Sequence, residues 1–296
     1  MKRKIISQGI GGYTIYLPNK WIKENNLTKG TDVDIEEIDN MLIISPTEVK
    51  LRLETSIQLT GNTESAIRTI ITNTYRKGYD KIIVEYDNEE QFKIMQHVIK
   101  TRLIGFDIMK KEKNKCIVES VTEPSIDQFE NILSKIFYNT EQLFEAVINK
   151  SEGKEHDNIE EIEERIQSYD NFCRRVISKD KIKNKKAEFL WAFLTLINHG
   201  QREIYHLSKL INTKLSKELI ELLRDGEKLF KLLEQAYFKK DKTLLADIHF
   251  LEKNLIYKKG YELLQKKGKE NIYLYHILLG IREFYQSNSP LMGIIV

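Results

Sequence analysis

The feature that most constrains this chain is the helical spacing of apolar side chains over residues 124–296. Apolar residues lie three or four positions apart along each segment, for example at Ile159, Ile162 and Ile166. Only four prolines occur in the 296 residues, which favours long helices because proline inside a helix removes a hydrogen bond. The pattern predicts three helices before Asn212 and three similar ones after it, near residues 215–239, 241–267 and 270–288.

The preceding residues, 47–123, alternate between strand and helix patterns and predict a small α/β unit. The helix over 63–77 has apolar residues on one face and is closed by Gly78. A second helix, over 89–103, ends near Gly105. The expected strands are a buried type at 82–84 and three others, at 53–59, 106–109 and 116–118.

Residues 1–46 predict short strands and turns around one short helix. A strand begins at Ile5, and Gly9, Gly11 and Gly12 break it with a tight turn. A second strand covers 13–17, and Pro18 suits the first turn of a helix over 19–26. A hairpin then joins 33–36 to 41–44 through the turn at 39–40.

Composition limits the cell compartment in which the chain is expected and the kind of surface with which it could bind nucleic acid. Hydrophobic residues make up 41% and charged residues 31%, and the net charge is only +3, so a nucleic-acid surface would have to be local. Cys116 and Cys173 do not form a CxxC pair, which fits a reducing compartment. The start of the chain lacks the apolar stretch of a signal peptide, and no apolar run reaches the length of about 18 that a membrane span needs. We therefore expect a cytoplasmic protein without membrane insertion.

An ordered set of motifs in the first 46 residues resembles the AbrB/MazE/SpoVT swapped-hairpin module. The segment from Gly11 to Ile22 (GGYTIYLPNKWI) carries the main match, and the residues at 27–33 (LTKGTDV) and 42–46 (LIISP) continue it in the same order. The resemblance implies an intertwined homodimer, in which the hairpin of each chain completes the barrel of the other, with a basic face that contacts DNA.

Residues 124–296 resemble PhoU, the phosphate-uptake regulator family, and the whole chain looks like the archaeal-type arrangement with an AbrB-like module before a PhoU-like bundle. The match lies in helix lengths and in a pattern with Glu163, Gln167 and Asp170 that ends in Arg174-Arg175. Metal-binding members would have an acid at Gln167 and an aspartate in the third helix, yet residues 194–211 contain none. We therefore predict no metal site, with Glu160, Glu163 and Glu164 as weak candidates.

The basic side chains of residues 1–46 precede nearly all of the acidic ones. Equal numbers of each occur, but the acids cluster between Asp32 and Asp39. Phosphate contacts need Lys or Arg, and a dimer would double the basic patch. The predicted DNA-binding residues are Lys2, Arg3, Lys4, Gly12, Tyr13, Lys20 and Lys23. The alternative is an ordinary solvated terminus.

Other polar residues favour structural roles. Glu160 and Glu164 share a helix face and could hold a hard cation, but the acidic run at 160–164 is more often a solvated face near a helix N-terminus, where the dipole favours acids. Single histidines on predicted helices are more often structural, and the glycines at 9–12 lack the lysine of a phosphate-binding loop. The sequence shows no pattern of catalytic residues, so we expect neither an enzyme nor a bound cofactor. The histidines concerned are His199, His206, His249 and His276.

The complete prediction is an α+β multidomain protein with a swapped-hairpin β-barrel head, an α/β middle unit and a helical bundle of two three-helix repeats. The expected domains cover residues 1–46, 47–123 and 124–296. The predicted function is a DNA-binding transcriptional regulator, linked by resemblance to phosphate homeostasis, whose bundle senses a signal or a protein partner. The alternatives are a dimeric adaptor that does not bind DNA and modulates a transporter or kinase, and an antitoxin, which fits the head but not the long helical tail.

Overall fold

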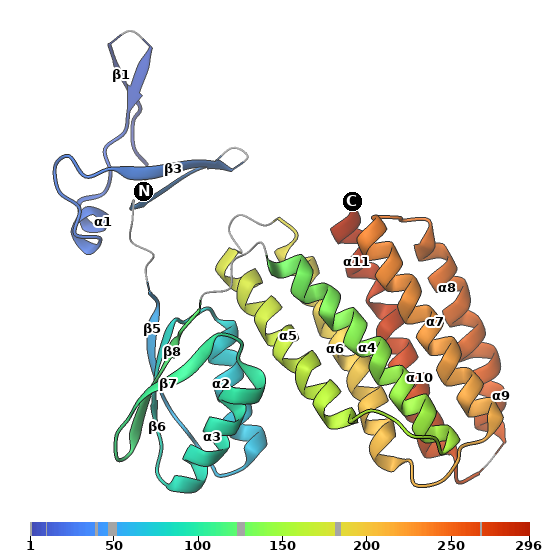
Figure 1. Ribbon diagram of the computed structural model, residues 1–296. Helices are drawn as coiled ribbons and strands as arrows, with labels where there is room; N and C mark the ends of the chain where they lie inside the picture. The colour runs from blue at the N-terminus through green and yellow to red at the C-terminus, as the bar shows by residue number, and fades with distance from the viewer. Residues whose placement is uncertain are drawn as a thin grey trace. The chain divides into compact units, whose positions relative to one another are not determined.

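The computed structural model describes residues 2–9, 11–38, 41–46, 52–122, 128–180, 185–266 and 268–296. The chain forms two compact units, Met1–Leu51 (unit 1) and Arg52–Val296 (unit 2) (Figure 1). The structure confirms an α+β protein with a helical C-terminal region, and no sheet among the described residues closes into a barrel. The helices in the described part of the chain all fall short of the length and apolar character that a bilayer span requires.

Unit 1 consists of two antiparallel hairpins and one short helix, with elements β1 (Ile6–Gln8), β2 (Gly12–Thr14), α1 (Asn19–Glu24), β3 (Val33–Ile38) and β4 (Met41–Pro46). Gly9 and Gly11 have positive φ angles, which explains the glycines between the first two strands. The second strand ends at Thr14, three residues earlier than predicted, and Pro18 precedes the helix as its N-cap. The predicted turn at 39–40 lies outside the described residues.

The first part of unit 2 is a four-stranded sheet with two helices, whose strand order is β5-β6-β8-β7. β5 and β6 are parallel and the other pairs antiparallel. Thr63 and Asn88 cap the two helices with their side chains, each of which accepts a hydrogen bond from a backbone N–H of the first turn. The elements are β5 (Glu54–Gln58), α2 (Glu64–Arg76), β6 (Lys81–Glu85), α3 (Glu89–Arg102), β7 (Phe106–Lys111) and β8 (Lys115–Ser120).

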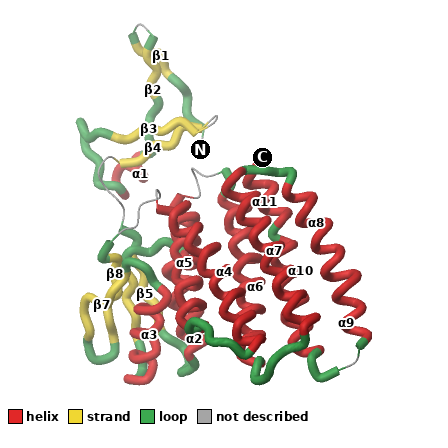
Figure 2. The backbone as a smooth tube through the Cα atoms, turned by 45° about the vertical axis from the view of Figure 1, so that its right-hand side comes forward, coloured by secondary structure: helices red, strands yellow, loops and turns green. Residues whose placement is uncertain are grey.

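The helices α2 and α3 lie together on one face of this sheet (Figures 1 and 2). Alternate strand residues such as Ile82, Val84 and Val118 point to that face and are buried with Ile67 and Tyr75 of α2. The α/β part of unit 2 therefore has a hydrophobic core of its own, separate from the core of the helices that follow.

The second part of unit 2 is a bundle of long helices (Figure 2). Four buried phenylalanines, Phe137, Phe144, Phe230 and Phe284, pack against one another with tilted rings whose centroids are 4.9–6.1 Å apart. Gly200 lets α6 approach α10, because a Cβ there would lie 2.6 Å from the ring of Phe284. The helices are α4 (Phe129–Glu152), α5 (Ile159–Asp180), α6 (Ala187–Leu210), α7 (Lys217–Lys239), α8 (Leu244–Asn254), η2 (Leu255–Gly260), α9 (Tyr261–Gln265), α10 (Asn271–Gln286) and α11 (Asn288–Ile295).

The structure differs from the sequence prediction in the last two predicted helices. The segment predicted as one helix over 241–267 contains a π-helical turn, η2, between α8 and α9. The last predicted helix ends at Gln286, and α11 restarts with Pro290 in its first turn, where the missing N–H is tolerated. Gln128 precedes α4 without a side-chain cap bond.

Two glutamates meet where α4 packs against α7. Burial, a hydrogen bond with Glu141 and the negative charge of Glu141 raise the pKa of Glu234 from 4.5 to about 7. Because the pKa is higher in the folded state, ionisation of Glu234 destabilises the fold increasingly as pH rises from about 4.5 to about 7.

We expect Glu234→Gln to raise the free energy of unfolding by about 1–2 kcal/mol at pH 8, a value reduced for partial exposure, and to have little effect near pH 4.5. The glutamine keeps a donor for Glu141 and removes the charge. Urea unfolding at both pH values measures the effect, with Glu145→Gln on the exposed side of α4 as the control. An equal gain at both pH values would contradict the pKa as the cause.

Candidate functional site

The predicted DNA-binding residues all lie in unit 1 and are solvent-exposed. Lys2, Arg3 and Lys4 precede β1, and Gly12 and Tyr13 form part of β2, with Tyr13 opposite Ser7. Lys20 and Lys23 lie on α1, where Lys20 is 3.7 Å from the carboxylate of Glu24. The basic side chains are therefore accessible to phosphates. No hydrogen bond or ion pair connects the N-terminal segment, β2 and α1 into one site within the described residues.

Unit 1 has no buried side chain among its described residues. Tyr13 is 74% exposed and Leu42 is 68% exposed, and Ile15 and Ile35 are exposed as well. Exposed apolar side chains on most strands are unusual for a complete fold, because hydrophobic burial is the main force that stabilises small domains. Unit 1 thus has the elements of a fold without a core.

A second polar arrangement lies in unit 2, where α5 faces the α/β part and α6. Polar residues recur along α5 at helical spacing, next to the apolar positions that the sequence identified, and most are buried. They are Glu163, Gln167, Asp170, Asn171, Arg174 and Arg175. A stripe of buried charges requires partners, because an unpaired charge in the interior is costly.

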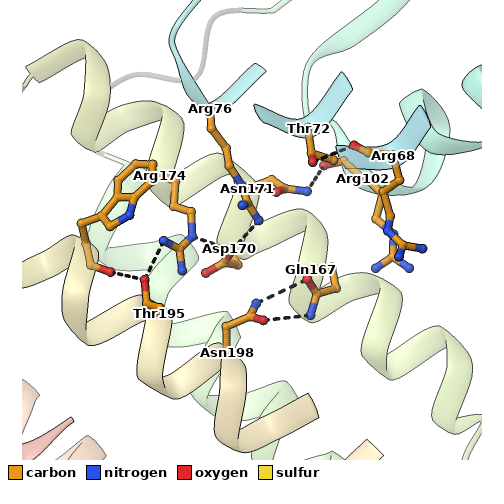
Figure 3. A network of polar contacts seen from close by, with 11 residues as sticks. Arg68, Thr72, Arg76, Arg102, Gln167, Asp170, Asn171, Arg174, Thr195 and Asn198 are labelled. Atoms are coloured by element: carbon orange, nitrogen blue, oxygen red, sulfur yellow. Dashed lines mark hydrogen bonds and ion pairs between the residues drawn. The ribbon is translucent and has the colours of Figure 1, made fainter. Parts of the chain in front are cut away.

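The partners of this stripe come from distant parts of the sequence (Figure 3). The guanidinium of Arg76, at the end of α2, donates to Asp170 at 3.1 Å and to Asn171 at 2.7 Å. Arg102, at the end of α3, donates to Glu163 at 3.1 Å. Each α/β helix therefore contributes one arginine that binds to the acidic side of α5.

Contacts to α6 complete the network. Arg174 donates to Asp170 at 2.8 Å and to the hydroxyl of Thr195 at 3.0 Å, and its guanidinium lies 4.9 Å from the ring of Trp191. The amides of Gln167 and Asn198 exchange two long hydrogen bonds, of 3.5 and 3.3 Å (Figure 3). Gln167 is thus paired with another neutral amide, and no carboxylate stands at its position.

Beside this network lies a cavity of about 530 Å³, which we call the arginine cavity. It is lined by polar residues from α2, α3, α5 and α6, with Tyr205 as the largest partly apolar side chain. Four arginines from three helices line it: Arg68, Arg76, Arg102 and Arg202. Such a volume lies within the usual range of small-ligand pockets, and its lining suits a polar, charged ligand.

The three weak metal candidates line the same cavity, but each has a basic partner. Glu160 pairs with Lys209, Glu163 with Arg102, and the carboxylate of Glu164 lies 3.8 Å from His97. The carboxylates of Glu160 and Glu164 therefore have partners on two different helices, α6 and α3. Glu163, expected on a solvated face, is buried. No group of three or more His, Cys, Asp or Glu side chains with metal-binding geometry occurs within the described residues.

The histidines of the bundle and the two cysteines of unit 2 have structural surroundings. His249 bonds to the hydroxyl of Tyr285, and His276 to the carboxylate of Glu203, both at 2.8 Å. Burial and the nearby charge of Arg202 lower the pKa of His206. Burial raises the pKa of Cys116 to about 11 and raises the pKa of Cys173 well above its usual range, so neither is a reactive thiolate at neutral pH.

The sequence pattern pointed to α5 but not to the arginine cavity. Arg68 and Arg76 stand on a helix predicted only from its apolar face, and Arg202 had no motif around it. One signal was available: arginines at 68 and 76 lie two turns apart on a single helix face. Comparison of the chain with models of protein families, with curated proteins and with solved structures found no match.

Proposed function

We propose that this protein is a dimeric DNA-binding transcriptional regulator, in which unit 1 dimerises and contacts duplex DNA and unit 2 responds to a signal or a protein partner. The resemblance to PhoU links the proposed regulator to phosphate homeostasis. The observation that carries the proposal is the missing core of unit 1, where no described side chain is buried.

A second copy of the chain is the partner that would supply this core. In the swapped-hairpin arrangement, the strands of two chains form one barrel, and side chains such as Ile15, Ile35 and Leu42 would be covered by the other chain. A module of this size rarely buries enough apolar surface alone, so dimerisation would provide its stability. Each dimer would then carry two copies of the basic N-terminal segment.

The charge distribution supports DNA as the ligand of this dimer. Lys2, Arg3 and Lys4 are exposed and come before the acidic β3. Each phosphate that they neutralise releases counterions, so the logarithm of affinity should fall with the logarithm of salt by about 0.9 per contact. The proposal places the protein in the cytoplasm, where DNA is accessible and free thiols such as Cys116 stay reduced.

Fluorescence anisotropy of the full chain with labelled genomic and random duplexes, across a salt series, tests the proposal. We expect binding at low salt, and we expect the triple change Lys2→Ala, Arg3→Ala and Lys4→Ala to weaken it for all duplexes and to flatten the salt slope. The side chains of these residues are exposed and form no hydrogen bond or ion pair with any described residue, so the variant should fold.

A charge-matched triple change serves as the control for this experiment. Lys110, Lys113 and Lys115 lie at the β7–β8 hairpin of unit 2, and replacing them with alanine removes the same charge. Equal weakening by both triple changes would mean a nonspecific response to net charge. An absence of binding at low salt would instead favour the adaptor, for which the exposed aromatic residues Phe250, Tyr257 and Tyr261 of α8, η2 and α9 offer a surface for a protein partner.

A further inference from the structure

The arginine cavity has a charge arrangement that structural pairing alone does not explain. Three of its four carboxylates pair with an arginine or a lysine, and the fourth, of Glu164, lies 3.8 Å from the imidazole of His97. Arg202 of α6, in contrast, forms no ion pair or hydrogen bond with any described residue. Its partly buried guanidinium lines the cavity. A cation without a partner in a polar cavity is a position where an anion can bind.

The other three arginines are held in place by contacts that leave part of each guanidinium unused. Arg76 donates through Nε and Nη2, Arg102 donates through Nη1 alone, and Arg68 pairs through Nη1 with Glu64. A guanidinium has five N–H donors, so each retains donors that no described residue accepts. Acidic partners fix the orientation of these side chains, and a fixed guanidinium loses less entropy when it binds a ligand.

This set of donors is best suited to a phosphoryl group. Guanidinium groups match phosphate oxygens with paired hydrogen bonds, and several arginines together can balance a doubly charged group. A divalent cation is disfavoured by four arginines, and an apolar ligand would find almost no apolar lining. Inorganic phosphate alone would leave most of a 530 Å³ cavity unfilled.

The remaining lining indicates what the rest of the ligand contains. Glu64 and Glu164 retain acceptor oxygens, and Ser65 and Asn73 of α2 add neutral polar groups whose side chains have no hydrogen-bond partner among the described residues. Carboxylate, amide and hydroxyl groups are partners for the hydroxyls of a sugar. A nucleobase would need a stacking surface, and Tyr205 is the one aromatic ring of the lining besides the imidazole of His97.

We propose that the arginine cavity binds a small sugar phosphate, with the phosphoryl group held by Arg202 together with Arg68, Arg76 and Arg102. Because α2 and α3 belong to the α/β part and α5 and α6 to the bundle, such a ligand would bridge the two parts of unit 2. As the effector of a regulator this ligand rests on the proposed function, but its binding is measured without DNA.

Isothermal titration calorimetry and thermal unfolding of the full chain at low ionic strength test the proposal, with ribose 5-phosphate and glucose 6-phosphate as probes. We expect both esters to bind and to raise the unfolding temperature, and ribose, glucose and inorganic phosphate to bind at least tenfold more weakly. Arg202→Ala should weaken ester binding by about tenfold to a hundredfold, because one charged hydrogen-bonded contact is lost. Arg202 forms no hydrogen bond or ion pair with any described residue, so this variant loses no polar contact that holds the described fold.

Arg224→Ala is the matched control, because Arg224 is an exposed arginine of α7 outside the cavity and pairs with Glu152. It should leave ester binding unchanged. The proposal is overturned if the esters do not bind at millimolar concentration, if Arg202→Ala binds them as well as the unchanged chain, or if inorganic phosphate binds equally well. Ester binding without DNA binding would refute the proposed regulator and support the sugar-phosphate site. DNA binding without ester binding would support the regulator and refute the sugar-phosphate site.

Discussion

Replacing Arg175 with alanine is expected to lower the free energy of unfolding of unit 2 by about 3–5 kcal/mol, because it breaks a buried ion pair with Asp80 and removes the hydrogen bonds that the buried guanidinium donates. Asp80 then keeps Lys179 as its basic partner. The side chain of Arg175 is 2% exposed. Its guanidinium donates to the carbonyls of Tyr75 and Tyr79 at 3.1 and 2.8 Å and to the carboxylate of Asp80. It also lies 4.8 Å from the ring of Phe106. One side chain of α5 thus holds the end of α2, the following turn and β7.

Urea unfolding followed by circular dichroism measures this loss. The control is Arg165→Ala on the same helix, where an exposed pairing with Glu161 at 4.0 Å and one hydrogen bond of 3.0 Å to Asn139 should together contribute about 1–2 kcal/mol. Arg175→Lys should fall between the two, because an ammonium cannot reach both carbonyls and the carboxylate with the geometry of a guanidinium. Similar small losses for Arg175→Ala and Arg165→Ala would refute the role of Arg175 as the link between the two parts.

Introducing a charge into the apolar surface of unit 1 is expected to convert the full chain from a dimer into a monomer. Leu42 on β4 is 68% exposed in the single chain, and in the proposed swapped dimer it would be buried by the second copy. An aspartate there would bury an unpaired charge at the interface, which costs several kcal/mol and exceeds what a small dimer can lose. We therefore expect Leu42→Asp to halve the mass and to abolish DNA binding.

Light scattering at micromolar concentration gives the mass, and Phe250→Asp is the matched control. Phe250 on α8 is 69% exposed, nearly the same as Leu42, but belongs to unit 2. If Phe250→Asp separates the chains and Leu42→Asp does not, the dimer forms through the bundle and the swapped-hairpin arrangement is wrong. A monomeric unchanged chain would also contradict it.

The sequence predicted the elements with local signals closely. The helix expected over 63–77 is α2 with Thr63 and Lys77 as its caps, because Thr63 accepts a hydrogen bond from the backbone of Ala66 and Gly78 adopts a positive φ angle. These signals act within a few residues, so they can be seen in a sequence. The π-turn at η2 has no such local signal, and the helix over 241–267 was predicted as continuous.

The network around α5 depends on contacts between residues that are far apart in the chain. Arg102 and Glu163 are 61 positions apart, and Arg175 and Asp80 are 95 apart. Spacing within α5 showed that polar residues share a face, but it could not show that arginines of α2 and α3 meet them. For the same reason Glu163 was assigned to a solvated acidic run, although the fold buries it against Arg102. The arginine cavity follows from this long-range packing.

The two cysteines lie in the two separate hydrophobic cores of unit 2, so they can serve as probes of how each core opens. Cys116 lies in the core of the α/β part, beside the sulfur of Met95, and Cys173 lies in the core of the bundle, two residues before Arg175. Both are fully buried, so a thiol reagent can reach either one only after the surrounding core opens. Each part of unit 2 therefore contains one buried thiol whose rate of labelling reports the opening of its own core. Equal rates for Cys116 and Cys173 would mean that the two parts open together, and different rates that they open separately.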